Sequence, residues 1–182
     1  VVWAALAVLR PGGPGPDGPE AGFARDMSTH HAQAVRMSFV VRDATDDEEV
    51  RLLAYDIINT QSAQIGMMTA WLDHWEAPKV DPGGSMRWMA GHGGHTGGTT
   101  MPGMATREQL GRLEAARGRD AEVLYLQLMI AHHRGGVSMA QAILARTDDD
   151  HVERLARSMV DGQRSEIDLM TRMLRERGAT QS

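Results

Sequence analysis

The sequence predicts an all-α protein: an antiparallel four-helix bundle made of two duplicated α-hairpins. Three observations favour this fold class. The 182-residue chain matches itself without a gap when it is shifted so that His30 falls on His132. Apolar side chains recur at helical spacing in both copies. A stretch rich in Gly and Pro, without such spacing, separates the copies and predicts a long connecting loop.

The repeat extends through the whole of each predicted hairpin. A shared register of this length indicates a duplicated supersecondary unit, and two narrow hairpins bury their apolar faces by stacking on each other. The matched pairs are Phe23 and Tyr125, Met27 and Met129, His30 and His132, His31 and His133, Val35 and Val137, Met37 and Met139, Val50 and Val152, Gln61 and Gln163, Ile65 and Ile167, Met68 and Met170, and Leu72 and Leu174.

Segment 1–20 is predicted to be a tail and linker outside the bundle. Its start, "VVWAALAVLR", has too few apolar residues to cross a bilayer, which needs about 20, and the Pro- and Gly-rich "PGGPGPDGPEAG" follows. We interpret the apolar stretch as the trailing end of a signal sequence or membrane anchor, which predicts a periplasmic, secreted or membrane-anchored protein. A short packed segment is the alternative.

A single helical domain is expected over 21–178, and its first half is an α-hairpin. Repeat 1, about 21–75, has apolar positions at helical spacing over 21–43 and again over 47–75. Between them, "DATDDEE" supplies an N-cap and first-turn acidic residues for the second helix.

The second half repeats this hairpin after a long loop over 76–105. Repeat 2, about 106–178, opens with a short extra helix in "TREQLGRLEAA", whose first residues form a capping-box pattern. Helices over 120–146 and 149–177 follow. The loop is rich in methionine and histidine, and a structureless stretch of this length inside a domain is often functional.

The composition excludes several classes of function. A net charge of -5 does not provide the basic surface that nucleic-acid binding requires. The absence of cysteine excludes disulfides, zinc ribbons and thiol catalysis. Because no Ser-His-Asp set, paired acids or phosphate loop has a convincing spacing, we expect no enzyme activity. The unusual entries are 13 methionines and eight histidines, against two phenylalanines and two tyrosines.

Each copy contains Met-x-x-His-His, with another methionine six residues after the pair. On an α-helix, Met27 and His31 lie one turn apart, on one broad face with His30 and Met37. The alternatives to a metal site are methionines that replace aromatic residues in the core and histidines held by hydrogen bonds. We predict metal ligands at Met27, His30, His31, Met37, Met129, His132, His133 and Met139, with weaker loop candidates at Met86, Met89, His92, His95, Met101 and Met104.

Polar residues interrupt the apolar stripe on the second helix of each copy. Gln61 and Gln64 in the first copy have Gln163 and Glu166 at the matching places in the second. Polar side chains on a buried face need partners, and outer carboxamides or carboxylates commonly orient histidine ligands. We therefore predict that these four side chains face the histidine pairs. The alternative is that they reach solvent at an end of the bundle.

The donor set favours copper, and Cu(I) over Cu(II). Di-iron and di-manganese bundles need Glu-x-x-His, but methionine stands three residues before His30 and His132. Zinc gains little from thioethers, whereas imidazole with thioether suits copper. We expect an extracytoplasmic protein that sequesters or carries copper, with a second copper-handling protein as a further partner. A copper-dependent redox enzyme and a metal-free interaction module with structural histidine pairs are the alternatives.

The motifs "FARDMSTHHAQAVRMS" and "YLQLMIAHHRGGVSMA", each followed by a Thr-Asp break, resemble those of domain-of-unknown-function family 305. The resemblance implies a ferritin-like helical bundle, export from the cytoplasm, and a role in copper binding or resistance like that of the CopM-type members. It also implies that the histidines and methionines of the two motifs form the metal-binding motif of the family.

Overall fold

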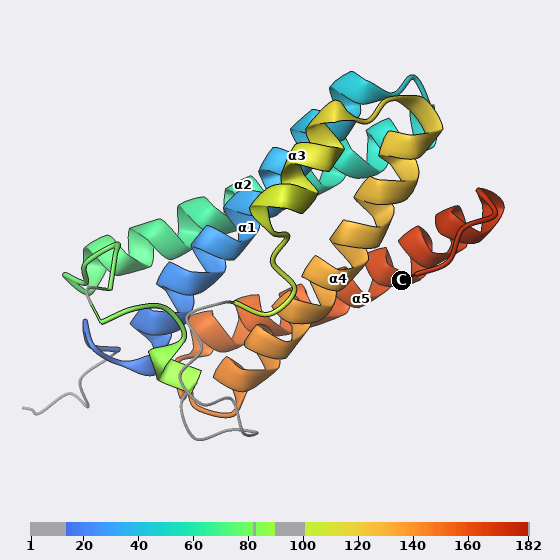
Figure 1. Cartoon of the computed structure of the whole chain (residues 1–182). Helices are drawn as coiled ribbons and strands as arrows, with labels where there is room; N and C mark the ends of the chain where they lie inside the picture. The colour runs from blue at the N-terminus through green and yellow to red at the C-terminus, as the bar shows by residue number, and fades with distance from the viewer. Residues whose placement is uncertain (1–13, 82, 90–100, 182) are drawn as a thin grey trace, which may run out of the picture.

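The computed structural model describes residues 14–81, 83–89 and 101–181. Within these residues the chain is helical and has no β-strand, which confirms the predicted all-α class (Figure 1). None of the described helices is both long and apolar enough to cross a membrane. The elements are α1 Pro19–Ala44, α2 Glu48–His74, the 3-10 turn η1 Arg87–Met89, α3 Arg107–Ala115, α4 Gly118–Leu144 and α5 Asp150–Glu176.

The turn inside each hairpin is built in the same way. Asp47 begins α2 by accepting a hydrogen bond from the Val50 amide, and Asp149 begins α5 by accepting one from the Val152 amide. In both turns a buried threonine hydroxyl also accepts a hydrogen bond from the amide of the capping aspartate. The repeated Thr-Asp-Asp therefore ends one helix and caps the next in each copy.

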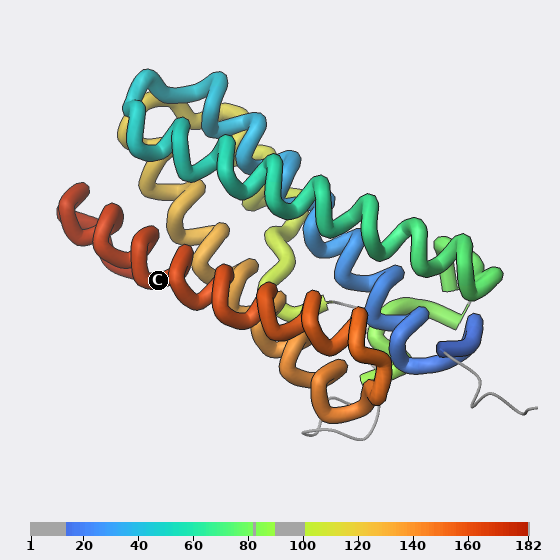
Figure 2. The backbone as a smooth tube through the Cα atoms, turned by 180° about the vertical axis from the view of Figure 1, so that it is seen from behind, coloured from blue at the N-terminus to red at the C-terminus, as the bar shows by residue number. Residues whose placement is uncertain are grey.

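The two hairpins meet along α1 and α4. Helix α1 packs against α2, α4 packs against α5, and the short helix α3 contacts both α1 and α4. Figure 2 shows α2 and α5 nearer the viewer, with α1 and α4 behind them. The side chains on α1 and α4 therefore determine how one hairpin contacts the other.

Two apolar clusters fill the two ends of the domain. All four long helices contribute to both clusters, because antiparallel packing brings the start of one helix beside the end of the next. The first, here the α3 cluster, holds Ala34, Met37, Val41, Val50, Leu53, Ala54, Ile57, Ala105, Leu113, Tyr125, Leu126, Leu128, Met129, Ile130, Met170, Met173 and Leu174. The second, here the loop cluster, holds Ala21, Phe23, Ala24, Met27, Met68, Leu72, Ala77, Met101, Met139, Ala140, Ile143, Val152, Leu155, Ala156, Met159 and Val160.

An arginine at the end of α5 ties the hairpins together beside the α3 cluster. Arg177 donates a hydrogen bond of 2.7 Å to the Glu122 carboxylate on α4 and lies 3.0 Å from the Asp47 carboxylate at the start of α2. Glu122 also accepts a hydrogen bond of 2.5 Å from the Thr45 hydroxyl. Glu122 and Arg177 are largely buried, which shields their ion pair from solvent.

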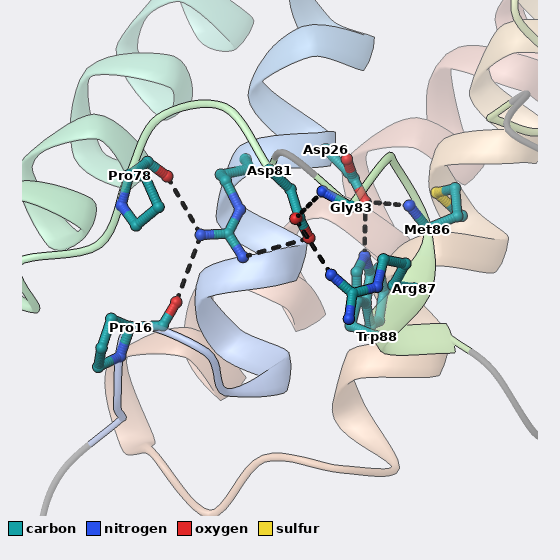
Figure 3. A network of polar contacts seen from close by, with 9 residues as sticks. Pro16, Asp26, Pro78, Asp81, Gly83, Met86, Arg87 and Trp88 are labelled. Carbon is teal, nitrogen blue, oxygen red and sulfur yellow. Dashed lines mark hydrogen bonds and ion pairs between the residues drawn. The ribbon is translucent and has the colours of Figure 1, made fainter.

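The connecting loop is more ordered than the sequence predicts, because polar groups on α1 hold it. The buried Asp26 carboxylate accepts hydrogen bonds from the Met86 amide, at 2.7 Å, and from the Trp88 indole, at 2.9 Å (Figure 3). The neighbouring Arg25 guanidinium donates to the Pro78 carbonyl at 3.1 Å. The prediction of a structureless loop is therefore wrong for this part: it contains η1 and packs against α1.

A second part of the loop, residues 101–105, lies across the contact between α1 and α4. The Gln33 carboxamide on α1 exchanges two hydrogen bonds with the Ala105 backbone. Gly103 has a φ of +76° and lies so close to the backbone of α4 that a Cβ atom would overlap the Ala131 carbonyl. On α4, a Cβ atom at Gly135 would overlap the Pro102 carbonyl. Glycine on both sides thus permits a backbone-to-backbone approach.

We expect Gly135→Ala to destabilise the protein by about 1–3 kcal/mol through overpacking, although alanine is the better helix former. The new methyl group would collide with the Pro102 backbone, which a side-chain rotation cannot relieve. The matched control is Gly162→Ala on α5, where a Cβ atom meets nothing within 4 Å; its expected effect is a gain of about 1 kcal/mol. Urea unfolding measures both, and equal gains would contradict the close approach.

Candidate metal centre

Four histidines lie between the two apolar clusters. His30 and His31 come from the middle of α1, and His132 and His133 from the middle of α4. All four are at most 1% exposed. We call them the histidine layer. Imidazoles are rarely enclosed this completely without a specific partner, so their contacts decide what the layer can do.

The two inner histidines join the hairpins. The His30 and His132 rings face one another, with centroids 3.7 Å apart and an angle of 30° between the planes. Within each pair the ring centroids are 6.5 Å apart on α1 and 6.3 Å apart on α4. The four imidazoles therefore form one group that spans both hairpins.

Each inner histidine donates a hydrogen bond from Nε2 to a backbone carbonyl. His30 donates to Pro102 of the loop at 3.0 Å, and His132 donates to the His30 carbonyl at 2.9 Å. A carbonyl can only accept, so Nε2 carries the proton in both rings. In a neutral imidazole this leaves the lone pair on Nδ1, the form that binds a metal.

Each outer histidine is held by the second helix of its own hairpin. His31 Nε2 donates to the Gln64 side-chain oxygen at 2.7 Å, and His133 Nε2 donates to the Glu166 carboxylate at 2.6 Å. Two of the four polar residues predicted to surround the layer thus contact it directly. These bonds place a proton on Nε2 here as well, so in the neutral form each of the four rings carries its lone pair on Nδ1.

The described residues include six buried acceptors without a hydrogen-bond donor, four of them in the layer. Within the described residues, no hydrogen-bond partner reaches the Nδ1 atom of any of the four histidines. The same is true of the side-chain oxygens of Gln61 and Gln163, which occupy matching places on α2 and α5. A buried acceptor without a donor is costly, and a set composed only of acceptors is suited to a cation. The layer therefore offers lone pairs of the kind that a cation accepts.

Burial keeps His30, His31 and His132 neutral. Removal from water lowers the pKa of His30 to about 4 and the pKa of His31 to about 3. Burial, with the neighbouring His30, also lowers the pKa of His132 well below its ordinary value. At neutral pH, protons compete little with a metal for the lone pairs of these imidazoles, which favours metal binding.

The four predicted methionine ligands of the bundle are completely buried on either side of the layer. Met27 and Met139 belong to the loop cluster, and Met37 and Met129 belong to the α3 cluster. Within the described residues, no three side chains drawn from histidine, aspartate and glutamate already form a metal-binding group. A site at the layer would therefore need donors of another kind, such as thioethers, beside the imidazoles.

Two methionines outside the Met-x-x-His-His motifs accompany these four. Met68 on α2 shares the loop cluster with Met27 and Met139, and Met170 on α5 shares the α3 cluster with Met37 and Met129. The repeat places Met68 and Met170 at matching positions, so the shared register was the signal that could have found them.

Four of the six loop candidates lie within the described residues. Met101 is buried in the loop cluster, and Met86, Met89 and Met104 are partly exposed and pack against it. The predicted candidates His92 and His95 lie outside the described residues.

Two other histidines lie at the surface, away from the layer. His74 and His151 line a groove of about 510 Å³ between the end of α2 and the start of α5. The stacked Trp71 and Trp75 rings, with centroids 5.9 Å apart, form another part of its wall. None of the four histidines of the layer lines this groove, so His74 and His151 can serve as controls for the layer.

Without metal, the protein is expected to lose stability as pH falls below about 6.5, the pKa of histidine in the unfolded chain. In the folded chain, His30 stays neutral down to about pH 4 and His31 to about pH 3. Protons therefore bind preferentially to the unfolded state in this window, and each such histidine removes up to about 1.4 kcal/mol per pH unit.

Urea unfolding at several pH values between about 7.5 and 4.5 measures this slope. We expect His132→Gln to reduce this slope by about one proton. A free energy of unfolding that does not change over this range would contradict the neutral, buried state of His30, His31 and His132.

Comparison with known proteins identifies the family. The DUF305 family, a domain of unknown function, matches residues 20–174. Among solved structures, the chain is similar to a DUF305 protein from Streptomyces coelicolor that has been proposed to be secreted, with 54% sequence identity, a TM-score of 0.84, and coverage of 91% of this chain and 98% of that chain. A DUF305 fragment from Deinococcus radiodurans has 33% identity, a TM-score of 0.70, and coverage of 86% and 95%.

A more distant likeness is to CopM. Its Cu(I)-bound form has 21% identity, a TM-score of 0.67, and coverage of 87% of this chain and 96% of that chain. Its Cu(II)-bound form has 22% identity, a TM-score of 0.66, and coverage of 87% and 97%. This likeness shows a shared fold. No curated protein matches the chain. Because the family match spans most of the sequence, the chain belongs to the DUF305 family.

Proposed function

We propose that this protein binds copper at the histidine layer and sequesters or carries it outside the cytoplasm. The observation that carries the proposal is the set of four buried Nδ1 lone pairs without a hydrogen-bond donor among the described residues. The hydrogen bonds of the Nε2 atoms fix these lone pairs in place, so the rings are oriented before a metal arrives.

The available donors favour copper over other metals. Imidazole nitrogen and thioether sulfur suit copper, Cu(I) above all, and the chain contains no cysteine that would make a thiolate site. A site without thiols also persists where thiols oxidise. The proposed ligands are drawn from His30, His31, His132 and His133 and the flanking Met27, Met37, Met129 and Met139, with Gln61, Gln64, Gln163 and Glu166 around them.

The relatives support this assignment. CopM has been solved with Cu(I) and with Cu(II), and its fold is shared with this chain. The Streptomyces coelicolor relative, proposed to be secreted, supports a place outside the cytoplasm. In this proposal the two hairpins are copies of one copper-binding unit within a ferritin-like four-helix bundle, and a second copper-handling protein supplies or receives the ion.

Burial of the layer favours a carrier over an enzyme. A redox enzyme must bring its substrate to an open coordination position on the metal, whereas a carrier needs only to bind and release the ion. The four imidazoles are almost completely enclosed. Their enclosure supports sequestration, since it separates bound copper from oxidants in the solvent.

Equilibrium dialysis against Cu(I) in the presence of a weak chelating competitor tests the proposal. We expect the full chain to retain copper and the double variant His132→Gln/His133→Gln to retain less, because glutamine offers no imidazole nitrogen. The matched control is His74→Gln/His151→Gln, in which two exposed histidines are replaced; it should retain as much copper as the wild type. A wild-type chain that retains no copper would overturn the proposal.

We expect the two halves of the site to differ in copper affinity, because Gln64 holds His31 and Glu166 holds His133. Replacing Glu166 by Gln keeps an acceptor for His133 but removes the carboxylate that makes the imidazole a stronger donor. We expect Glu166→Gln to weaken copper binding by about tenfold or more, within the range usual for the partners of ligand histidines. The reciprocal Gln64→Glu should strengthen binding.

Competition titration with a colorimetric Cu(I) chelator gives both affinities, and circular dichroism verifies that the variants fold. Equal affinities for the wild type and both variants would show that the carboxylate does not act on the metal through His133.

A further inference from the structure

We propose that the methionines of the loop cluster form a loading route, by which a soft monovalent cation passes from the surface to the histidine layer at one end of the bundle only. This inference rests on the proposed function and deepens it, since it adds a direction of access to the same site. It concerns thioether sulfur as a transient ligand, and Cu(I) or Ag(I) as the ion.

The methionines are distributed unequally over the two ends. Eight of the 13 in the chain are buried in the loop cluster or pack against it, four are buried in the α3 cluster, and Met67 is exposed. The repeat alone does not produce this difference, because each cluster receives three methionines at matching positions. The excess comes mainly from the loop, which contributes Met86, Met89, Met101 and Met104, all to the same end.

These methionines range from partly exposed to fully buried. Met86, Met89 and Met104 are partly exposed, Met101 is 8% exposed, and Met27 is 0% exposed. All pack in or against one cluster. On α1, Met27 lies one helical turn before His31 and so leads to the layer. A soft cation can move along such a series because each thioether binds it weakly and exchanges readily.

The loop is held against α1 by contacts that place this series. The Asp26 carboxylate, next to Met27 in the chain, accepts hydrogen bonds from the Met86 amide and the Trp88 indole (Figure 3). At the other end of the loop, the Pro102 carbonyl accepts the hydrogen bond of His30. The loop therefore joins the surface to the layer through two fixed points.

The α3 cluster offers no comparable route. Its methionines, Met37, Met129, Met170 and Met173, are all completely buried. No partly exposed methionine packs against this cluster among the described residues. The ion pair of Arg177 with Glu122 and the Thr45 hydrogen bond to Glu122 hold the helices together at the same end. Access by thioether exchange is therefore confined to the loop end.

The test compares the rate of loading with the amount loaded. In the full chain, Met86, Met89 and Met104 are all replaced by leucine, which conserves volume and removes sulfur. Stopped-flow absorbance follows the transfer of Cu(I) from a coloured chelator complex to the protein, and dialysis measures the copper retained at equilibrium. We expect transfer to slow by at least about tenfold, with the retained copper unchanged, because the final ligands are intact.

Two single variants are matched controls. Met67→Leu changes an exposed methionine outside both clusters, and Met173→Leu changes a buried methionine of the α3 cluster; both should load at the wild-type rate. If the triple variant does not fold, as judged by circular dichroism, the single Met104→Leu variant carries the test and should load more slowly than both controls.

The outcomes separate this inference from the proposed function. A triple variant that loads as fast as the wild type would overturn the route while leaving copper binding established. Loss of retained copper at an unchanged rate would also overturn it, because the loop methionines would then be final ligands. A wild type that retains no copper instead refutes the proposed function itself.

Discussion

The contact between His30 and His132 is the constraint on which the rest of the structure depends. Two imidazoles that face one another at 3.7 Å hold α1 and α4 at one place along their lengths. The hydrogen bond from His132 to the His30 carbonyl fixes this place further. The apolar clusters then fill the ends on either side. A polar contact at the centre specifies one register, whereas apolar packing alone tolerates sliding.

This centre carries a cost that explains its chemistry. Four imidazoles have been taken out of water and each has been given one partner, at Nε2 only. The unpaired Nδ1 atoms destabilise the metal-free protein. A bound cation would accept the lone pairs that it reaches, so ligand binding and folding stability would be coupled at the layer. The same incomplete pairing that weakens the protein prepares it for its proposed ligand.

The all-helical fold was readable from the sequence because helical spacing and the repeat agree over both hairpins. The burial of the histidines also followed, since they share helix faces with apolar residues. The hydrogen-bond partner of His30 could not be predicted, because the Pro102 carbonyl belongs to a loop without periodicity. The η1 turn was missed for the same reason: the Asp26 carboxylate that holds it is distant along the chain. Local patterns cannot report such contacts.

The connecting loop contacts unlike residues at matching places of the two hairpins, and this difference requires a single chain. Two identical hairpins could pair as a symmetric dimer, with equivalent imidazoles in contact across the axis. In that arrangement the two hairpins would carry the same residue at the position where this chain has Gln33 on α1 and Gly135 on α4. A single polypeptide does not impose that requirement. Gly135 on α4 can therefore leave room for the backbone of the connecting loop, while Gln33 on α1 binds that loop through its side chain.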